Sequence, residues 1–243
     1  MQTIHAPAPQ YRLADHVRAC RVDEQVILLD LRRNKYLGFR GRQVDALSQI
    51  IVDWPGAQTG TNNASPNLSA MAALQPLLVQ HLLSKVGTGV PAGPLLPQAL
   101  ECVDPDAPLT RLHGAGRDLL RLAIAAAGAA LWLSRFNLAE IASRVARRRA
   151  LGGINDAREN TLALRDAVSS YMRLRPFLFT AQDKCLHDSV TLIRFLARRR
   201  MFPAWVIGVR IRPFGAHSWV QSGSLVLNDV HEHVRTYTPI LVV

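Results

Sequence analysis

A stretch rich in proline near the middle of the chain most constrains what this chain can fold into. Proline cannot donate a main-chain hydrogen bond and breaks helices, so a segment dense in proline does not join a packed core. We predict an interdomain linker over residues 87–110 and therefore two domains, residues 1–86 and residues 111–243. The five prolines of this stretch are Pro91, Pro94, Pro97, Pro105 and Pro108.

Charged residues are divided unequally between the two predicted halves. The 243 residues include 29 Lys or Arg and 18 Asp or Glu, for a net charge of +11. Residues 1–110 hold nine basic and nine acidic residues, whereas residues 111–243 hold twenty and nine. The second half thus carries the whole positive surplus, and this difference also favours two domains.

Cysteine usage and the apolar segments indicate the compartment. Cys20, Cys102 and Cys185 show no CxxC spacing, so they predict neither a disulfide framework nor a zinc site. The N-terminus lacks the basic and apolar regions of a signal peptide. The longest apolar run, residues 122–133, is shorter than the roughly 20 residues that span a bilayer. We expect a cytoplasmic protein without a membrane span, metal or other cofactor, and nucleotide dependence stays open.

In the first half, the sequence predicts strands before helices. Short runs of β-branched and aromatic residues separated by turn residues predict a three-stranded meander over residues 18–22, 25–31 and 35–39. Apolar residues at helical spacing then predict helices over residues 43–54 and 70–86.

The second half changes from helical to extended periodicity after Pro203. Asn137 and Glu140 have the spacing of a capping box, which predicts a helix that runs to Arg149. Helices followed by antiparallel strands predict an α+β domain. The further predicted helices cover residues 158–173 and 185–200, and the predicted strands cover residues 205–211, 217–221, 224–228 and 235–243.

Three residues have the order and placement of a cysteine acyl-transfer site. Cys185 lies at a predicted helix start, where free N–H groups and the helix dipole stabilise a thiolate. His217 follows 32 residues later on a predicted strand, and Asp229 follows 12 residues after that. Cysteine acyl-transfer enzymes need a nucleophile, a base and an orienting carboxylate in such an arrangement. The sequence predicts these roles for Cys185, His217 and Asp229 in turn.

Each of these residues also has a structural interpretation. A cysteine at a helix start is more often a small buried hydrophobe, and Asp229 could be a turn residue. Three other histidines, His187, His231 and His233, lie close enough in sequence to be the base. Gln182 could supply a second oxyanion donor or only cap the helix.

Two arginine triplets end predicted helices of the second half. They cover residues 147–149 and 198–200. Cations at the end of a helix complement its dipole, so we interpret both triplets as solvated helix ends in preference to a dedicated binding site.

The stretch from Arg175 to Asp229 resembles the leader peptidases, or B proteins, of lasso-peptide biosynthesis, a branch of the transglutaminase-like superfamily. The resemblance implies a papain/transglutaminase-like fold of helices and antiparallel sheet. It also implies peptide-bond hydrolysis by a thiol protease, with Cys185 as nucleophile, His217 as base and Asp229 as orienting acid. The matching residues are Cys185, Leu186, Ser189, residues 216–220 and Asp229.

This resemblance also implies the substrate and the partners. The enzyme would remove the leader peptide of a lasso-peptide precursor before macrolactam closure, and an asparagine-synthetase-like cyclase would close the ring. Ser218 and Gln221 depart from the family, where Ala and Glu are common at these positions. We expect Gln221 to alter a substrate contact.

The first half resembles the peptide-recognition domain that is similar to the pyrroloquinoline-quinone D protein. Residues 26–30 followed by residues 35–39 carry this resemblance. It implies a three-stranded, winged-helix-like domain that captures the leader as an added strand. We predict Tyr36, Leu37 and Phe39 as leader-binding residues, although Tyr36 could equally be a core residue.

Two other functions fit parts of the sequence. A transglutaminase-like acyltransferase would use the same triad with an amine as acceptor, and the sequence does not separate water from an amine. The predicted recognition domain favours hydrolysis of a peptide. A basic winged-helix protein that binds nucleic acid should concentrate its charge on the reading domain, whereas residues 1–110 are neutral. We therefore expect no nucleic-acid partner.

Overall fold

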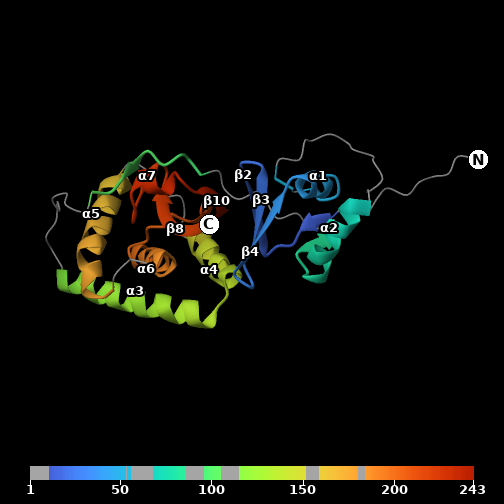
Figure 1. Ribbon diagram of the computed structural model, residues 1–243. Coiled ribbons are helices and arrows are strands. Elements are labelled where there is room, and N and C mark those ends of the chain that lie inside the picture. Colours follow the sequence, from blue (N-terminus) through green and yellow to red (C-terminus); the bar gives the residue numbers. More distant parts are fainter. Residues whose placement is uncertain are drawn as a thin grey trace, which may run out of the picture. The chain divides into compact units, whose positions relative to one another are not determined.

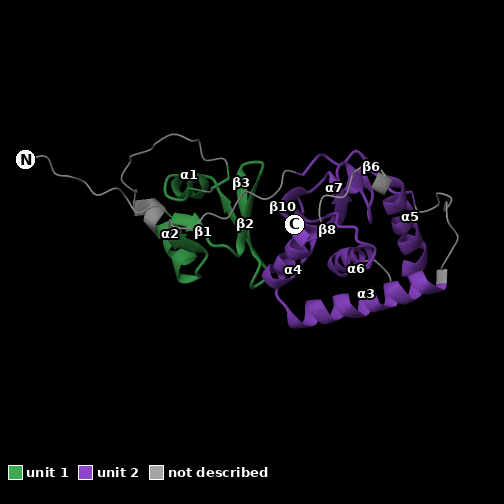
Figure 2. Cartoon of the chain, turned by 180° about the vertical axis from the view of Figure 1, so that it is seen from behind, with its two compact units in different colours: residues 1–92 green, residues 93–243 purple. Residues whose placement is uncertain are grey.

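The chain forms two compact units, residues 1–92 and residues 93–243, coloured separately in Figure 2. The structure, a computed structural model, describes residues 11–52, 54–55, 68–85, 96–104, 115–151, 159–179 and 184–243. We describe each unit by itself.

The first unit is built on an antiparallel sheet with the strand order β2-β3-β4 (Figure 1). Its strands are β2 (Val17–Val22), β3 (Gln25–Asp30) and β4 (Lys35–Arg40). The turns contain Asp23 and Asn34 with φ of 51° and 52°, a left-handed conformation that short polar side chains tolerate. The predicted three-stranded meander is confirmed.

Two helices and a short strand pair cover this sheet. The helices are α1 (Arg42–Ser48) and α2 (Leu68–Val79), and β1 (Tyr11–Leu13) pairs antiparallel with β5 (Leu83–Lys85). Their apolar residues share one core with β3, which includes the buried side chains of Leu28, Leu47, Leu74 and Leu77.

Both helices of the first unit end earlier than the sequence predicts. α1 ends at Ser48 and not at residue 54, and α2 ends at Val79 and not at residue 86. The chain leaves each helix to bond with β1: Val52 donates its N–H to the carbonyl of Tyr11 (3.0 Å), and β5 pairs along β1. Helical periodicity does not reveal these main-chain partners.

The second unit contains a five-stranded sheet with the strand order β10-β7-β8-β9-β6. β9 pairs parallel with β6, and the other neighbours are antiparallel. The predicted helices-then-sheet order of an α+β domain is confirmed. The strands are β6 (Glu101–Cys102), β7 (Ala204–Ile211), β8 (Phe214–Ser222), β9 (Leu225–Val226) and β10 (Thr238–Val242).

The described part of the predicted linker belongs to the sheet of the second unit. Leu100 donates its N–H to the carbonyl of Ser224 (3.0 Å), and Ala99 is buried in a cluster with Trp219. The prediction of a linker over residues 87–110 therefore needs correction for residues 96–104. The second unit begins at residue 93, ahead of the predicted start at residue 111.

One helix of the second unit lies between another helix and the sheet. α6 contacts α3 on one side and β8 on the other (Figure 1). A four-residue helix, α7, interrupts the region where the sequence predicts only strands. The helices are α3 (Ala115–Arg135), α4 (Leu138–Leu151), α5 (Glu159–Leu174), the single turn η1 (Arg175–Phe177), α6 (Cys185–Ala197) and α7 (His231–Val234).

The predicted capping box starts α4. The N–H of Glu140 donates to Asn137 Oδ1 and the N–H of Asn137 donates to Glu140 Oε2, each at 3.0 Å. Two N–H groups that the helix itself cannot satisfy thus find acceptors. Among the helices that the structure describes, none combines the length and apolar character needed to cross a membrane.

Candidate active site

Cys185 is the first residue of α6, as the sequence predicts. The preceding Lys184 has φ of −124° and its side chain does not cap the helix. The first N–H groups of any helix lack acceptors within the helix, and here the N-cap side chain does not supply one. The N–H of Leu186 and the N–H of Ser218, on β8, both hydrogen-bond to the sulfur of Cys185. The sulfur thus lies in a setting that stabilises negative charge.

His217 lies on β8 between Cys185 and Asp229. Its Nε2 is 2.5 Å from Asp229 Oδ2, and its ring also hydrogen-bonds with the thiol of Cys185. Because Nε2 is engaged by the carboxylate, Nδ1 is the ring nitrogen that faces the sulfur. The imidazole stacks on Trp219 (ring centres 6.1 Å apart, 15° between planes) and lies 5.2 Å from the ring centre of Tyr237. These contacts hold the imidazole between its two polar partners.

Asp229 follows β9 in a loop that Asn228 holds in place. Asp229 Oδ1 accepts the N–H of Val230 at 2.7 Å. Asn228 Oδ1 accepts the N–H of Val220, on β8, at 2.8 Å. The same strand thus carries His217 and anchors the loop that presents its carboxylate partner.

The pKa values of the three groups favour a thiolate–imidazolium pair. Burial raises the pKa of Cys185, but hydrogen bonds with His217 and with the N–H of Ser218 outweigh it, and the pKa falls below its ordinary value. Burial lowers the pKa of His217, yet hydrogen bonds with Asp229 and Cys185 raise it to about 9. Burial raises the pKa of Asp229, and the hydrogen bond with His217 brings it below its ordinary value.

These shifts predict the pH dependence of any reaction that needs the pair. Falling pH protonates the thiolate, and rising pH removes the imidazolium proton near pH 9. We expect kcat/KM for such a reaction to decline on an alkaline limb near pH 9, while alkylation of Cys185 by iodoacetamide does not decline there. Asp229→Asn should move this limb to lower pH. An alkaline limb near pH 6.5, the ordinary pKa of histidine, would contradict the assignment.

The three histidines that the sequence left as alternative bases have different surroundings. His187 hydrogen-bonds with the backbone of Ala126 on α3, and His231 lies 3.1 Å from the carboxylate of Glu232. His233 Nδ1 lies 3.1 Å from Asp229 Oδ2, so Asp229 has two histidine partners. Of these histidines and His217, only His217 hydrogen-bonds with Cys185 among the described residues. His233 contacts Asp229, on the side of His217 away from Cys185. That these residues act as nucleophile, base and orienting acid stays a prediction.

His217, Asp229 and His233 could also hold a metal ion. One ligand atom from each lies within 4.8 Å of the others. His217 Nε2 already faces the Asp229 carboxylate, so a metal there would compete with the hydrogen bond that orients the imidazole. Metal binding at this group would therefore oppose the acyl-transfer arrangement.

A buried carboxylate that the sequence pattern did not predict connects the elements around the site. Asp188, one turn after Cys185 on α6, is 2% exposed. It accepts hydrogen bonds from Tyr171 Oη on α5 (2.7 Å), Arg175 Nη1 of η1 (3.2 Å) and Asn228 Nδ2 (2.7 Å). The sequence did contain one indication of this network, because Asp188 lies in a helix with a predicted apolar stripe. A carboxylate that is buried in such a helix needs hydrogen-bond partners from other elements. Asp188 connects α6, which begins with Cys185, to the loop of Asp229.

Gln221 has a structural role in place of the expected substrate contact. It is 1% exposed, accepts a hydrogen bond from Trp219 Nε1 (3.0 Å) and donates to the carbonyl of Pro97 (2.7 Å). Ser218 is also buried, and its Oγ accepts a hydrogen bond from Trp205 Nε1 (2.8 Å). Both departures from the family thus fill polar positions inside the sheet. Gln182 lies outside the described residues.

The predicted leader-binding residues lie on β4 of the first unit. Leu37 and Phe39 pack against the core of that unit, and Phe39 meets Trp54 edge-on with ring centres 5.5 Å apart. Tyr36 lies on the opposite face because successive side chains of a strand alternate. In the sheet that the structure describes, β4 is an edge strand.

Comparisons with known proteins agree with the geometry of the second unit. Residues 123–242, just under half of the chain, match the family model described as the transglutaminase-like superfamily. The microcin J25-processing protein McjB of Escherichia coli is 49% identical over 48 residues, which are 20% of this chain and 23% of McjB. The chain thus matches less than a quarter of the length of this relative. No solved structure gives a significant match.

Proposed function

Starting from a transglutaminase-like domain in the second unit, we propose that this protein is a cysteine peptidase that removes the leader of a lasso-peptide precursor. The observation that carries the proposal is the hydrogen-bonded row of Cys185, His217 and Asp229 at the start of a helix. The partial similarity to a microcin-processing protein supports a peptide precursor as the substrate.

In the first step, the thiolate of Cys185 attacks the carbonyl carbon of the scissile bond. The carbonyl electrons move to oxygen, and N–H groups at the start of α6 can stabilise this charge. As the tetrahedral intermediate collapses, the C–N bond breaks and the imidazolium of His217 protonates the leaving amine. The leader is then held as a thioester on Cys185, and the core peptide leaves with a free amino group.

In the second step, water cleaves the thioester. Neutral His217 takes a proton from the water as its oxygen attacks the thioester carbon, and Asp229 stabilises the imidazolium that forms. Collapse of the second intermediate expels the thiolate and releases the leader as a carboxylate. The starting thiolate–imidazolium pair is restored.

We assign leader recognition to the first unit and ring closure to a separate protein. β4 is an edge strand, and an extended leader could add to it through main-chain hydrogen bonds. The free amino group of the cleaved core is what an asparagine-synthetase-like cyclase would need to form the macrolactam. We place the reaction in the cytoplasm, where the three free thiols would stay reduced.

Cleavage of a synthetic precursor by the full chain tests the reaction itself. We expect mass spectrometry to find a leader with a new carboxylate, which carries one heavy oxygen when the reaction runs in H₂¹⁸O. Added putrescine distinguishes the alternative, because an acyltransferase would attach the amine to the leader. An amine adduct as the main product would replace hydrolysis by acyl transfer.

Leader affinity of the full chain tests the role of the first unit. Tyr36→Ala should weaken binding of a fluorescent leader about five- to tenfold, as the loss of an aromatic contact does. Affinity should change little between about 50 and about 300 mM salt, because strand addition rests on main-chain hydrogen bonds and apolar contacts in place of charge pairs. Arg21→Ala, at an exposed position of β2, is the control and should bind normally. Normal binding by Tyr36→Ala, or a steep salt dependence, would contradict strand addition at β4.

A further inference from the structure

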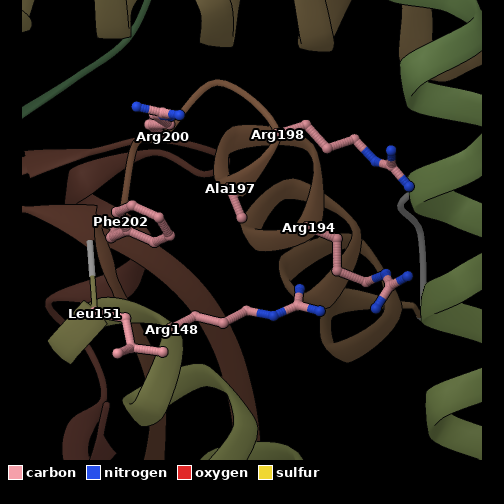
Figure 3. Close-up of a pocket in the computed structure, with 7 residues that line it drawn as sticks. All are labelled: Arg148, Leu151, Arg194, Ala197, Arg198, Arg200 and Phe202. Atoms are coloured by element: carbon pink, nitrogen blue, oxygen red, sulfur yellow. The ribbon is translucent and has the colours of Figure 1, made fainter.

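A cavity lined by arginines lies between the ends of α4 and α6 in the second unit. Its volume is about 570 Å³, and its described lining contains basic and apolar residues but no carboxylate. Leu151 and Phe202 form apolar walls (Figure 3). The arginines of the lining are Arg148, Arg194, Arg198 and Arg200.

Arg194 brings buried donors to this cavity without acceptors. Its Nε and Nη1 are buried, and within the part of the chain that the structure describes they have no hydrogen-bond partner. Burial lowers the pKa of Arg194, and the neighbouring charges of Arg148 and Arg198 lower it further. A buried polar group without a partner costs free energy, and an anion in the cavity would compensate the clustered positive charge around Arg194.

Arg148 is held beside Arg194 by a shared aromatic surface. The guanidinium carbon of Arg194 lies 4.3 Å from the ring centre of Trp132, and that of Arg148 lies 4.9 Å from it. Figure 3 shows the two side chains extending toward each other, while Arg198 and Arg200 extend elsewhere. Cation–π contacts of this kind fix the orientation of planar guanidinium groups. The guanidinium groups of Arg148 and Arg194 thus lie next to each other at the cavity, and the described lining contains no carboxylate to neutralise them.

Gly128 of α3 gives Arg194 the room for this position. A Cβ at residue 128 would overlap the guanidinium group of Arg194. Glycine is unfavourable inside a helix, so its use here accompanies a close approach of another group. The place of Arg194 is therefore built by α3 as well as by α6.

We propose that this cavity binds a phosphate-bearing small molecule through Arg148 and Arg194. Guanidinium groups bind phosphate oxygens in pairs of charge-assisted hydrogen bonds, and a phosphate dianion matches two adjacent cations. The cavity is larger than a phosphate group and falls in the usual range of small-molecule sites, so the apolar walls would contact the rest of the ligand.

This site is separate from the triad. Arg194 follows Cys185 by nine residues on α6, which is about 13 Å along the helix axis at 1.5 Å per residue. The ligand would thus bind at the opposite end of the helix that begins with the nucleophile. The proposal does not depend on the peptidase assignment, because its test measures binding.

Calorimetry of the full chain with pyrophosphate and inorganic phosphate, at constant ionic strength, tests the proposal. We expect pyrophosphate to bind, and Arg148→Gln to weaken binding at least about tenfold. Arg147→Gln is the matched control, because it removes the same charge from an exposed position of the same helix outside the cavity lining. Its affinity should stay within about twofold of the wild-type value.

Two further arms separate the specific site from general attraction. Arg194→Lys keeps the charge but removes the planar pair of donors, and it should also weaken binding. At mildly alkaline pH succinate and inorganic phosphate both carry two negative charges, so succinate, which has carboxylates in place of phosphate, should bind more weakly than inorganic phosphate. Absence of pyrophosphate binding to the wild type, an equal loss in Arg147→Gln, or equal affinity for succinate and inorganic phosphate would each overturn the proposal. Circular dichroism of each variant verifies that it is folded.

Discussion

Replacing Cys185 by alanine is expected to abolish cleavage of the precursor while the second unit stays folded. The thiolate forms the bond to the scissile carbon, so its loss should reduce kcat/KM by a factor on the order of 10⁴ or more. Cys102→Ala makes the same chemical change on β6 of the same unit and should keep near-normal activity. The measurement is mass spectrometry of precursor cleavage. Wild-type rates in Cys185→Ala would refute the mechanism.

His217→Ala should be about as severe, because it removes both the partner of the thiolate and the acid that protonates the leaving amine. Asp229→Asn should retain more activity, since a thiolate–imidazolium pair needs less orientation than a serine nucleophile does. His231→Ala is the control, because this residue lies beside Glu232 and not beside Cys185. If His217→Ala kept its activity and His233→Ala lost it, the base would be reassigned.

Asp188→Ala is expected to cause the largest loss of stability among these variants. The substitution leaves Arg175 without its buried partner and removes an acceptor from Tyr171 and Asn228. Breaking a buried ion pair from one side costs about 3 to 5 kcal/mol of unfolding free energy. Urea denaturation monitored by tryptophan fluorescence measures this loss, because three of the four tryptophans belong to the second unit.

A double substitution separates the ion pair from general disruption of the helix. In Asp188→Ala/Arg175→Met no buried charge is left unpaired, so the loss should be smaller than the sum of the two single losses. Asp188→Asn keeps an acceptor for Tyr171 and should fall between the wild type and Asp188→Ala. Additive losses in the double variant would show that Arg175 and Asp188 do not depend on each other.

Local sequence signals predicted those parts of the fold whose causes are local. The Asn137–Glu140 capping box set the start of α4, and the position of Cys185 at the start of α6 followed from the apolar spacing after it. Short runs of β-branched and aromatic residues, separated by turn residues, predicted the meander of the first unit within residues 18–39. Each of these features depends on residues within a few positions of one another.

Features that depend on distant partners were not predicted. β6 pairs with β9, which lies more than a hundred residues later in the sequence. Because β6 has only two residues, its sequence shows no strand periodicity. Asp188 and Asn228 meet only after α6 and the sheet have packed together. Arg148 and Arg194 meet on Trp132 only when α3, α4 and α6 are packed together. For this reason the arginine triplets at residues 147–149 and 198–200, which we interpreted as solvated helix ends, did not predict the cavity.

The attachment of β6 also decides where the second unit could be joined to a different first unit. Pro97 accepts a hydrogen bond from Gln221, and β6 closes the sheet edge beside β9. A chimaera fused at residue 111 would lose Pro97 and β6, and it would expose the edge of β9 to intermolecular pairing. A junction at residues 92 and 93 keeps the sheet whole. With the leader-binding role that we propose for the first unit, exchange of this unit between similar chains should transfer leader specificity at that junction and yield aggregates when the junction is placed further downstream.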